Sequence, residues 1–293
     1  MNAPRAPEWE DPRRVLARHT LAPKRSFSQN FLVARGVVEK IADAVELAPG
    51  DTVLELGAGL GTLTSALLRR GAHVVAIERD RDMLRVLEAE LGATGMVEIL
   101  AADAAAIDYA SFAARAPESR GRIAVAGNLP YAATGAILRS LVGARASISR
   151  AVLMMQREVR DRLLAPPGTR AYGALTVFTR AAFEIQPVLL VRAGAFHPPP
   201  KVSSAVVRLV PRATPLAEES DSFRTVVRAA FETRRKTLRN ALLVSAGASA
   251  ERADSALSRA GIDGSRRGET LGIEDFDALA RAWAEIGPAP RSS

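Results

Sequence analysis

Residues 53–61 read Val-Leu-Glu-Leu-Gly-Ala-Gly-Leu-Gly, in which a short apolar run leads directly into a glycine-rich turn. Leucines at helical spacing follow, so this stretch predicts a strand, a turn and a helix in succession. Glycines let the backbone approach a ligand closely, and open α/β sheets bind ligands beside the carboxyl ends of their strands. The G-x-G-x-G spacing, preceded by Glu55, disfavours a dinucleotide turn. Taken alone, the turn also fits an ordinary loop.

Short apolar runs and helical patterns alternate on both sides of this stretch. Further strands are predicted at 73–77, 97–100, 123–126 and 151–155. Helices are predicted at 35–45, 60–70, 80–91, 134–142 and 157–164. This alternation indicates an α/β fold whose mostly parallel sheet is covered on both faces. Residues 188–191 and 204–210 flank a proline-rich turn and predict an antiparallel hairpin at the sheet edge.

Composition changes along the chain suggest how it divides into domains. The predicted parts are a flexible amino-terminal segment at 1–20, a catalytic domain at 21–211, a small all-helical domain at 212–287 and a flexible tail at 288–293. Three prolines among charged residues mark the first part. From residue 222 onward the pattern is helical, with no strand signal.

The composition excludes several classes of protein. Cysteine is absent and only three histidines occur, so disulfide scaffolds, thiolate metal sites and cysteine nucleophiles are ruled out and no metal site is expected. No apolar run is long enough to span a bilayer, and the first thirty residues lack a signal-peptide core. We therefore expect a soluble, cytoplasmic protein.

The net charge of +8 fits either a solvated basic surface or a polyanionic partner. Residues 36–150 carry twelve basic and fourteen acidic side chains, whereas residues 1–35 carry seven and three. Residues 224–293 carry twelve and nine. The pattern predicts a near-neutral catalytic body with basic flanking surfaces.

Two acidic residues follow the next predicted strands along the chain. Glu78 ends the second strand, where a carboxylate can accept hydrogen bonds from both hydroxyls of a ribose. Asp103 follows the third strand and could accept a hydrogen bond from an adenine amine. Each residue alone could be an ordinary solvated acid. Together with the glycine turn, the series resembles the class I S-adenosylmethionine-dependent methyltransferases. That resemblance implies S-adenosylmethionine as cofactor, with Gly57 beneath its methionine part, Glu78 at its ribose and Asp103 at its adenine.

Asn128-Leu129-Pro130-Tyr131 follows the fourth predicted strand and resembles the signature of methyltransferases that act on planar amino groups. The Asn128 oxygen and the Leu129 carbonyl could accept the protons of an adenine N6 amine and so localise its lone pair. Pro130 would make the turn rigid, and Tyr131 could stack on a base taken out of its helical stack. Taken in isolation, this segment could also be a plain strand-to-turn proline with a packed tyrosine.

A second segment could complete the site. Phe196 could form the other face of a base sandwich, and Lys201 could meet a phosphate, although the three prolines between them could simply make a rigid loop.

Several longer motifs resemble those of the ribosomal RNA adenine dimethyltransferases, particularly the branch that acts on the small subunit. These motifs lie at 24–32, 128–131, 156–159, 172–173, 196–206 and 231–240. The resemblance implies dimethylation of the N6 amines of two adjacent adenines near the 3′ end of small-subunit (16S) ribosomal RNA. It also implies that Asn30 and Leu32 border the cofactor pocket, along with Gly57, Gly59, Glu78, Asp103 and Asn128. Ser28 and Ser203 stand where the family usually has glycine and aspartate.

The family resemblance gives the basic flanks an expected role as contacts to RNA phosphates. The expected RNA-binding residues are Lys24, Arg25, Lys201, Arg234, Arg235, Lys236 and Arg239. The last four are expected close together on one helix. The expected partner is small-subunit ribosomal RNA within an assembling small subunit, bound by a monomeric enzyme. The alternatives are a large-subunit methyltransferase of the antibiotic-resistance type, a DNA adenine methyltransferase, whose tetrad usually begins Asp-Pro-Pro or Asn-Pro-Pro, and a non-enzymatic RNA-binding factor.

Overall fold

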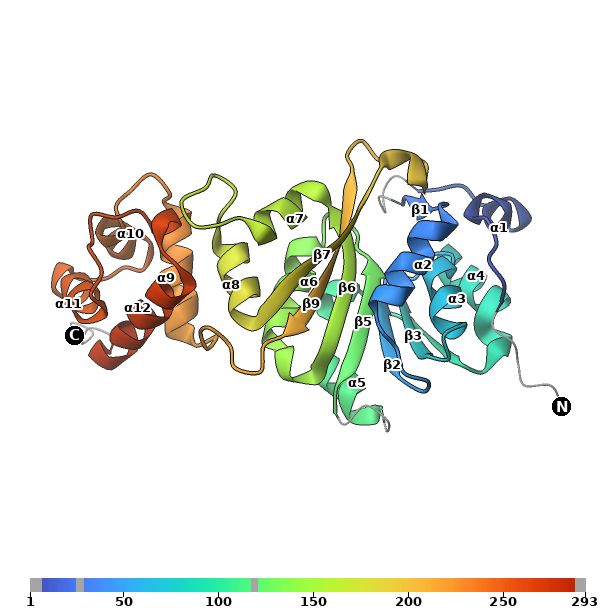
Figure 1. Ribbon diagram of the computed structural model, residues 1–293, viewed down its shortest axis with the longest axis horizontal. Helices are drawn as coiled ribbons and strands as arrows, with labels where there is room; N and C mark the ends of the chain where they lie inside the picture. The colour runs from blue at the N-terminus through green and yellow to red at the C-terminus, as the bar shows by residue number, and fades with distance from the viewer. Residues whose placement is uncertain (1–6, 25–28, 117–120, 288–293) are drawn as a thin grey trace. The chain divides into compact units, whose positions relative to one another are not determined.

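In the computed structural model, which describes residues 7–24, 29–116 and 121–287, a seven-stranded sheet forms the centre of the first part of the chain (Figure 1). Its strands, in spatial order, are β4 (Val97–Ala101), β3 (His73–Glu78), β2 (Thr52–Leu56), β5 (Ile123–Asn128), β6 (Ile148–Gln156), β9 (Ser204–Pro211) and β7 (Phe183–Val191). Strands β2 to β6 pair in parallel, and β9 pairs antiparallel with β6. The predicted α/β class with its antiparallel strands at one edge is therefore confirmed.

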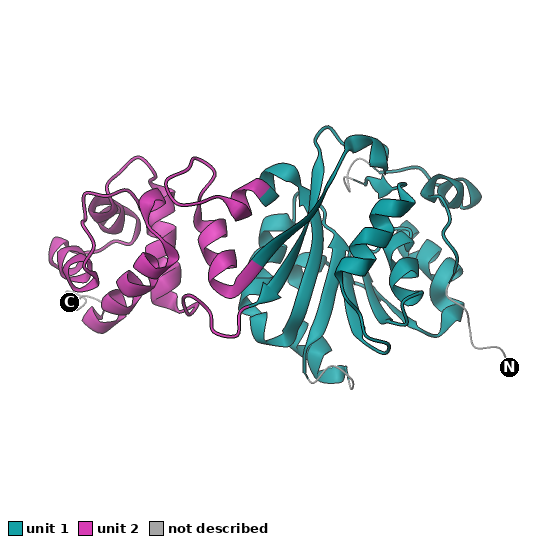
Figure 2. Ribbon diagram, in the orientation of Figure 1, with its two compact units in different colours: residues 1–160, 185–211 teal, residues 161–184, 212–293 magenta. Residues whose placement is uncertain are grey.

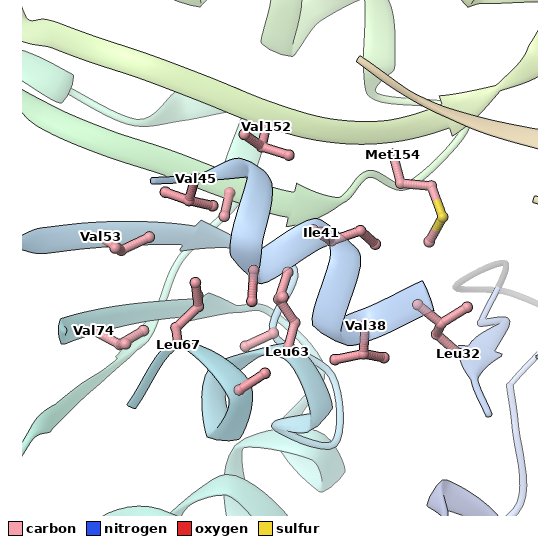
Figure 3. Packing of buried hydrophobic residues seen from close by; sticks show 14 of the residues in the cluster. Leu32, Val38, Ile41, Val45, Val53, Leu63, Leu67, Val74, Val152 and Met154 are labelled. Carbon is pink, nitrogen blue, oxygen red and sulfur yellow. The ribbon is translucent and has the colours of Figure 1, made fainter. Parts of the chain in front are cut away.

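Helices connect and cover the parallel strands. They are α1 (Pro12–Arg18), α2 (Arg35–Ala44), α3 (Thr62–Leu68), α4 (Arg81–Leu91), α5 (Tyr109–Arg115), α6 (Thr134–Gly143) and α7 (Arg157–Leu164). Val53 and Leu54, which point to opposite faces of β2, are both fully buried. Both faces of the sheet are thus covered, as expected for parallel strands that read as continuous apolar runs. Figure 3 shows part of this core, where Val38, Ile41 and Leu63 of α2 and α3 pack beside the strands.

The amino-terminal segment contains helix α1, so the prediction of a flexible segment is wrong for residues 7–20. Asp11 caps this helix by accepting a hydrogen bond from the Arg13 amide, and Pro12 occupies its first turn. Val15 and Leu16 are buried in a cluster with Phe31 of β1, with Leu60 of the turn before α3, and with side chains of α4. Residues 1–6 and the predicted tail at 288–293 lie outside the described residues.

A separate two-stranded sheet joins distant parts of the sequence. Strand β1 (Phe31–Leu32) pairs antiparallel with β8 (Phe196–His197), so that Phe31 lies opposite His197 and Leu32 opposite Phe196. This pairing ties the segment before α2 to the loop between β7 and β9. Both segments carry motifs of the resemblance described above.

The chain divides into two compact units, residues 1–160 with 185–211 and residues 161–184 with 212–293 (Figure 2). The second unit contains the last residues of α7, from Asp161 onward, and five further helices. These are α8 (Ala174–Ala182), α9 (Asp221–Glu232), α10 (Leu238–Ser245), α11 (Ala250–Ala260) and α12 (Ile273–Ile286). The division differs from the predicted boundary because residues 161–184 belong to the helical unit. Tyr172 and Phe178 explain this difference, since their rings meet those of Phe231 and Phe223 in the helical core. Within the described ranges, no helix is long and apolar enough to cross a membrane.

Candidate active site

A cavity of about 450 Å³ opens at the carboxyl ends of the parallel strands in the first unit. It lies where β2 pairs with β3 on one side and with β5 on the other, so the chain departs in opposite directions from neighbouring strands. Such a switch point is the usual ligand site of an open α/β sheet. Its walls are formed by residues 29–32, 57–60, 77–79, 102–105 and 128–133, together with Val38, Ile41, Glu55, Thr62, Leu63 and Ala136.

The glycine turn forms the floor of this cavity. Gly57, Gly59 and Gly61 have φ angles of +75°, +57° and +78°, a backbone conformation that residues with a side chain rarely adopt. The Gly57 and Ala58 amides both donate to the Ile77 carbonyl, at 2.9 and 3.1 Å, and hold the turn against β3. A Cβ atom on Gly61 would lie 2.7 Å from a methyl group of Leu91. The turn therefore needs glycine both for backbone conformation and for close packing.

Glu78 lies at the end of β3 with its carboxylate held by backbone amides. Its Oε2 accepts from the Gly59 amide at 2.9 Å, and its Oε1 accepts from the amides of Arg79 and Asp80 at 2.8 and 2.9 Å. These three bonds fix the carboxylate in the cavity wall. A carboxylate offers about four acceptor positions, so capacity remains for a ligand hydroxyl.

Asp103 lies on the neighbouring wall, after β4. Its Oδ1 accepts from the Ala105 amide at 2.9 Å, which starts a short 3-10 turn, and its Oδ2 lies 3.6 Å from Arg79 Nη1. The side chain is half exposed. It therefore keeps an oriented acceptor at the cavity without being buried.

Asn128 ends β5 on the opposite side of the glycine turn. Its Nδ2 donates to the Asn30 carbonyl at 3.2 Å, so one side of the amide is occupied and Oδ1 is the group left to accept from a ligand amine. The Leu129 amide donates to the Met154 carbonyl at 3.0 Å and holds the turn on β6. The position before Asn128 requires glycine, because a Cβ atom on Gly127 would lie 2.6 Å from the Leu56 carbonyl oxygen.

The Tyr131 ring lines the cavity, and its hydroxyl lies 2.9 Å from the hydroxyl of Ser204 on β9. Ser204 is fully buried, so the tyrosine is anchored at its far end. Phe196 is only 3 % exposed and packs in the hydrophobic core rather than in the cavity wall. The pairing of β8 with β1 places Phe196 opposite Leu32, which lines the cavity, and the base sandwich between Tyr131 and Phe196 stays a prediction.

Glu55 is a buried carboxylate in the cavity wall, 1 % exposed. The Thr64 hydroxyl donates to its Oε2 at 2.6 Å. Burial raises the pKa of Glu55 to about 8, and the nearby Glu78 charge acts in the same direction, while the Thr64 bond opposes both. Near neutral pH this carboxyl is therefore largely protonated.

The family profile of "Ribosomal RNA adenine dimethylase" matches residues 21–283 of the chain. The chain belongs to the ribosomal RNA adenine dimethylase family. It is 48% identical over 281 residues to "Ribosomal RNA small subunit methyltransferase A" of Anaeromyxobacter dehalogenans (strain 2CP-C), covering 94% of this chain and 98% of that protein. The protein of the same name from Myxococcus xanthus (strain DK1622) is 46% identical, covering 96% and 98%.

Solved structures show the same dimethylase architecture. A dimethyladenosine transferase from Plasmodium falciparum superposes with a TM-score of 0.74 at 25% identity, covering 88% of this chain and 98% of that one. The 23S rRNA methyltransferase ErmE superposes with a TM-score of 0.62 at 30% identity, covering 87% and 100%. These likenesses agree with the class I methyltransferase fold and with an enzyme that methylates ribosomal RNA.

The structure brings together nearly all the pocket residues expected of a dimethylase. Those that line the one cavity are Asn30, Leu32, Gly57, Gly59, Glu78, Asp103, Asn128, Leu129, Pro130 and Tyr131. Several residues that line or support the cavity were not predicted, among them Gln29, Arg79, Asp80 and Ser204. Gln29 stands inside a quoted motif and Asp80 precedes a helix as a capping residue should, so both had a signal. Ser204 also stands inside a quoted motif, at 196–206, whereas Arg79 had no signal, because its partner Asp103 comes from another segment.

The four basic residues expected close together on one helix do not lie on one helix. Helix α9 ends at Glu232, a turn follows, and α10 begins at Leu238 with Thr237 as its cap. Thr237 captures the Asn240 amide and so starts a new helix. The expectation that Arg234, Arg235, Lys236 and Arg239 share one helix is therefore wrong.

These basic side chains also differ in what they contact. Arg234 is bound to Glu269 and to the carbonyls of Arg170 and Tyr172, and Arg239 is paired with Asp254 at 2.6 Å. Lys24 contacts two aspartates, whereas Arg25 lies outside the described residues. Three exposed cations, Lys201, Arg235 and Lys236, form no ion pair with any described residue.

Proposed function

We propose that the protein transfers methyl groups from S-adenosylmethionine to the N6 amines of two adjacent adenines near the 3′ end of small-subunit ribosomal RNA. The observation that carries this proposal is the convergence of the glycine turn, two acids and the Asn-Leu-Pro-Tyr turn on one cavity. The names of the bacterial relatives support the small subunit as the source of the RNA.

The residues of the cavity fit S-adenosylmethionine. The glycine turn leaves room for close approach of a ligand, Glu78 offers acceptors for the ribose hydroxyls, and Asp103 offers one for the adenine amine. When bound, this cofactor supplies a methyl group made electrophilic by its positively charged sulfur. Because the cavity walls supply these acceptors already oriented, positioning of the reactants accounts for much of the expected rate.

Asn128 and Leu129 would activate the attacking amine. The lone pair of adenine N6 is delocalised into the ring, so the amine is a poor nucleophile. The Asn128 Oδ1 atom and the Leu129 carbonyl would accept hydrogen bonds from its two N–H groups and hold the lone pair toward the cofactor. The hydrogen bond from Asn128 Nδ2 to Asn30 keeps Oδ1 turned to this task. The ring of Tyr131, anchored on Ser204, would stack on the extruded base.

Contacts to RNA phosphates would come from the exposed cations. Lys201 lies on the loop before β9, and Arg235 and Lys236 lie on the turn between α9 and α10. Such contacts give affinity and orientation without reading sequence, so the shape of the RNA in the subunit would select the adenines. The proposal includes an assembling small subunit in the cytoplasm as substrate and a monomeric enzyme.

The deciding experiment is mass mapping of methylated adenines after incubation with unmethylated small subunits and S-adenosylmethionine. We expect two adjacent adenines, each gaining two methyl groups, and far less product at the same time point with the Asn128→Ala variant. Large subunits serve as the matched control, since the similarity to ErmE makes their RNA the competing substrate. Methylation of large-subunit RNA alone would overturn the small-subunit assignment, and no methylation of either would overturn the activity.

A further inference from the structure

Asp80 is the centre of a hydrogen-bonded junction beside the cavity. Its Oδ1 accepts from Lys24 Nζ at 2.6 Å, and its Oδ2 accepts from Gln29 Nε2 at 2.7 Å. The Gln29 Oε1 atom in turn accepts from the Lys24 amide at 2.8 Å. We call the three residues Lys24, Gln29 and Asp80 the Asp80 junction. It joins the segment before β1 to the start of α4, more than fifty residues away.

Asp80 is built into this position. It is 2% exposed, and its Oδ1 also caps α4 by accepting from the Asp82 amide at 2.9 Å. Burial opposes its ionisation, but the hydrogen bonds from Lys24, from Asp82 and from Gln29 together hold the pKa of Asp80 below its usual value. A buried charge that is paired and hydrogen-bonded in this way is costly to disturb.

The junction reaches both chemical ends of the cavity. On one side, the Asp80 amide donates to Glu78 Oε1, so the position of Asp80 helps to orient the carboxylate expected at the ribose. On the other side, Gln29 is followed by Asn30, whose carbonyl accepts from Asn128 Nδ2. One buried carboxylate thus links the cofactor wall to the residue expected to accept the protons of the amine.

We propose that Asp80 is a positioning residue, which, through Lys24 and Gln29, aligns Glu78 and Asn128 for cofactor binding and methyl transfer. This inference rests on the proposed function, because it assigns the junction a role toward S-adenosylmethionine. It also gives Lys24 a role within the protein in place of the phosphate contact expected from its charge.

The direction of one hydrogen bond supplies a sharp test. In Asp80→Asn, the new amide nitrogen would face Gln29 Nε2, and in Gln29→Glu, the new carboxylate would face that of Asp80. In the double variant, the new amide at position 80 donates to the new carboxylate at position 29. Lys24 Nζ still donates to the side-chain oxygen at position 80, and the Lys24 amide still donates to a carboxylate oxygen at position 29. Total charge and all the side-chain hydrogen bonds of the junction are kept, with one donor–acceptor pair exchanged.

Calorimetric affinity for S-adenosylmethionine should fall roughly tenfold or more in each single variant, as expected for loss of a hydrogen bond to a charged group. The double variant should recover affinity to within about threefold of the wild-type value. Its kcat should recover in parallel, measured well below the unfolding temperature of every variant. Asp82→Asn is the matched control, since Asp82 also contacts Lys24 but touches neither Gln29 nor Glu78 in the described contacts, and its affinity should not change.

The possible outcomes separate this inference from the proposed function. Single variants that bind the cofactor like the wild type, even if less stable, would overturn the positioning role. A double variant no better than the single variants would overturn the directional hydrogen bond as its cause. Wild-type protein that binds no S-adenosylmethionine would instead overturn the proposed function itself.

Discussion

The residues expected at the cavity lie together around it, whereas the basic residues expected to bind RNA differ in what they contact. The cavity residues follow separate strands, yet they meet because the carboxyl ends of parallel strands share one edge of the sheet. The basic residues have no such constraint, and Lys24, Arg234 and Arg239 are held by nearby acids. Topology thus makes the cavity side predictable, while the availability of a surface charge depends on its neighbours.

The largest expected effect is on the cavity side. Asn128→Ala removes the oxygen proposed to accept a proton of the amine, so kcat should fall about 10²- to 10³-fold, as for loss of one oriented catalytic hydrogen-bonding group. Affinity for the cofactor should change far less. Single-turnover methylation of small subunits, with calorimetry alongside, checks both. Normal turnover in this variant would contradict the proposed role of Asn128 in activating the amine.

Glu78→Gln should weaken cofactor binding about 10- to 100-fold, since a hydrogen bond to a charged group is worth about 1.5–3 kcal/mol. The glutamine keeps the shape of the side chain but offers only one acceptor oxygen to the amides and ribose. Calorimetry measures the change. Asp103→Asn serves for comparison and should have a smaller effect, because that side chain is half exposed. Equal affinity in Glu78→Gln would remove the ribose assignment.

The protonated Glu55 predicts how the stability of the cofactor-free protein depends on pH. Its pKa of about 8 lies above the ordinary value of 4.5, so between these values the folded chain retains a proton that the unfolded chain has lost. The contribution of Glu55 to stability is therefore fully present below pH 4.5 and is lost as pH rises toward 8, by at most about 1.4 kcal/mol per pH unit.

Urea unfolding of the wild type and of Glu55→Gln over this pH range measures that contribution. The free energy of unfolding of the wild type, relative to that of Glu55→Gln, should fall as pH rises from 4.5 toward 8. A constant difference would show that Glu55 is already ionised at neutral pH.

The smallest effects are expected among the basic residues, and they sharpen the comparison. Replacing both Arg235 and Lys236 with alanine should weaken RNA binding severalfold and lower the slope of log affinity against log salt by about 1.5 to 2. Arg239→Ala should leave that slope unchanged and mainly lose its pair with Asp254. Filter binding to small-subunit RNA at several salt concentrations distinguishes the two. Equal salt slopes for both variants would contradict the prediction that only the exposed, unpaired cations contact RNA phosphates.

Local signals determined much of this protein from sequence alone. The strand–turn–helix at 53–61, the acids Glu78 and Asp103, and the turn at 128–131 each occupy a strand end, and alternation along the chain placed those ends at one sheet edge. The signal for α1 was also local, in Asp11 followed by Pro12, but the prolines and charges around it suggested disorder instead.

Only the tertiary structure decided which distant residues became partners. It placed Phe196 in the core through β8, anchored Tyr131 on Ser204, joined Lys24 to Asp80, and drew residues 161–184 into the helical unit. Hydrophobic periodicity and turn residues act over a few positions and can be read along the chain. A hydrogen bond between residues more than fifty positions apart depends on how the whole chain packs, so no local pattern in the sequence specifies it.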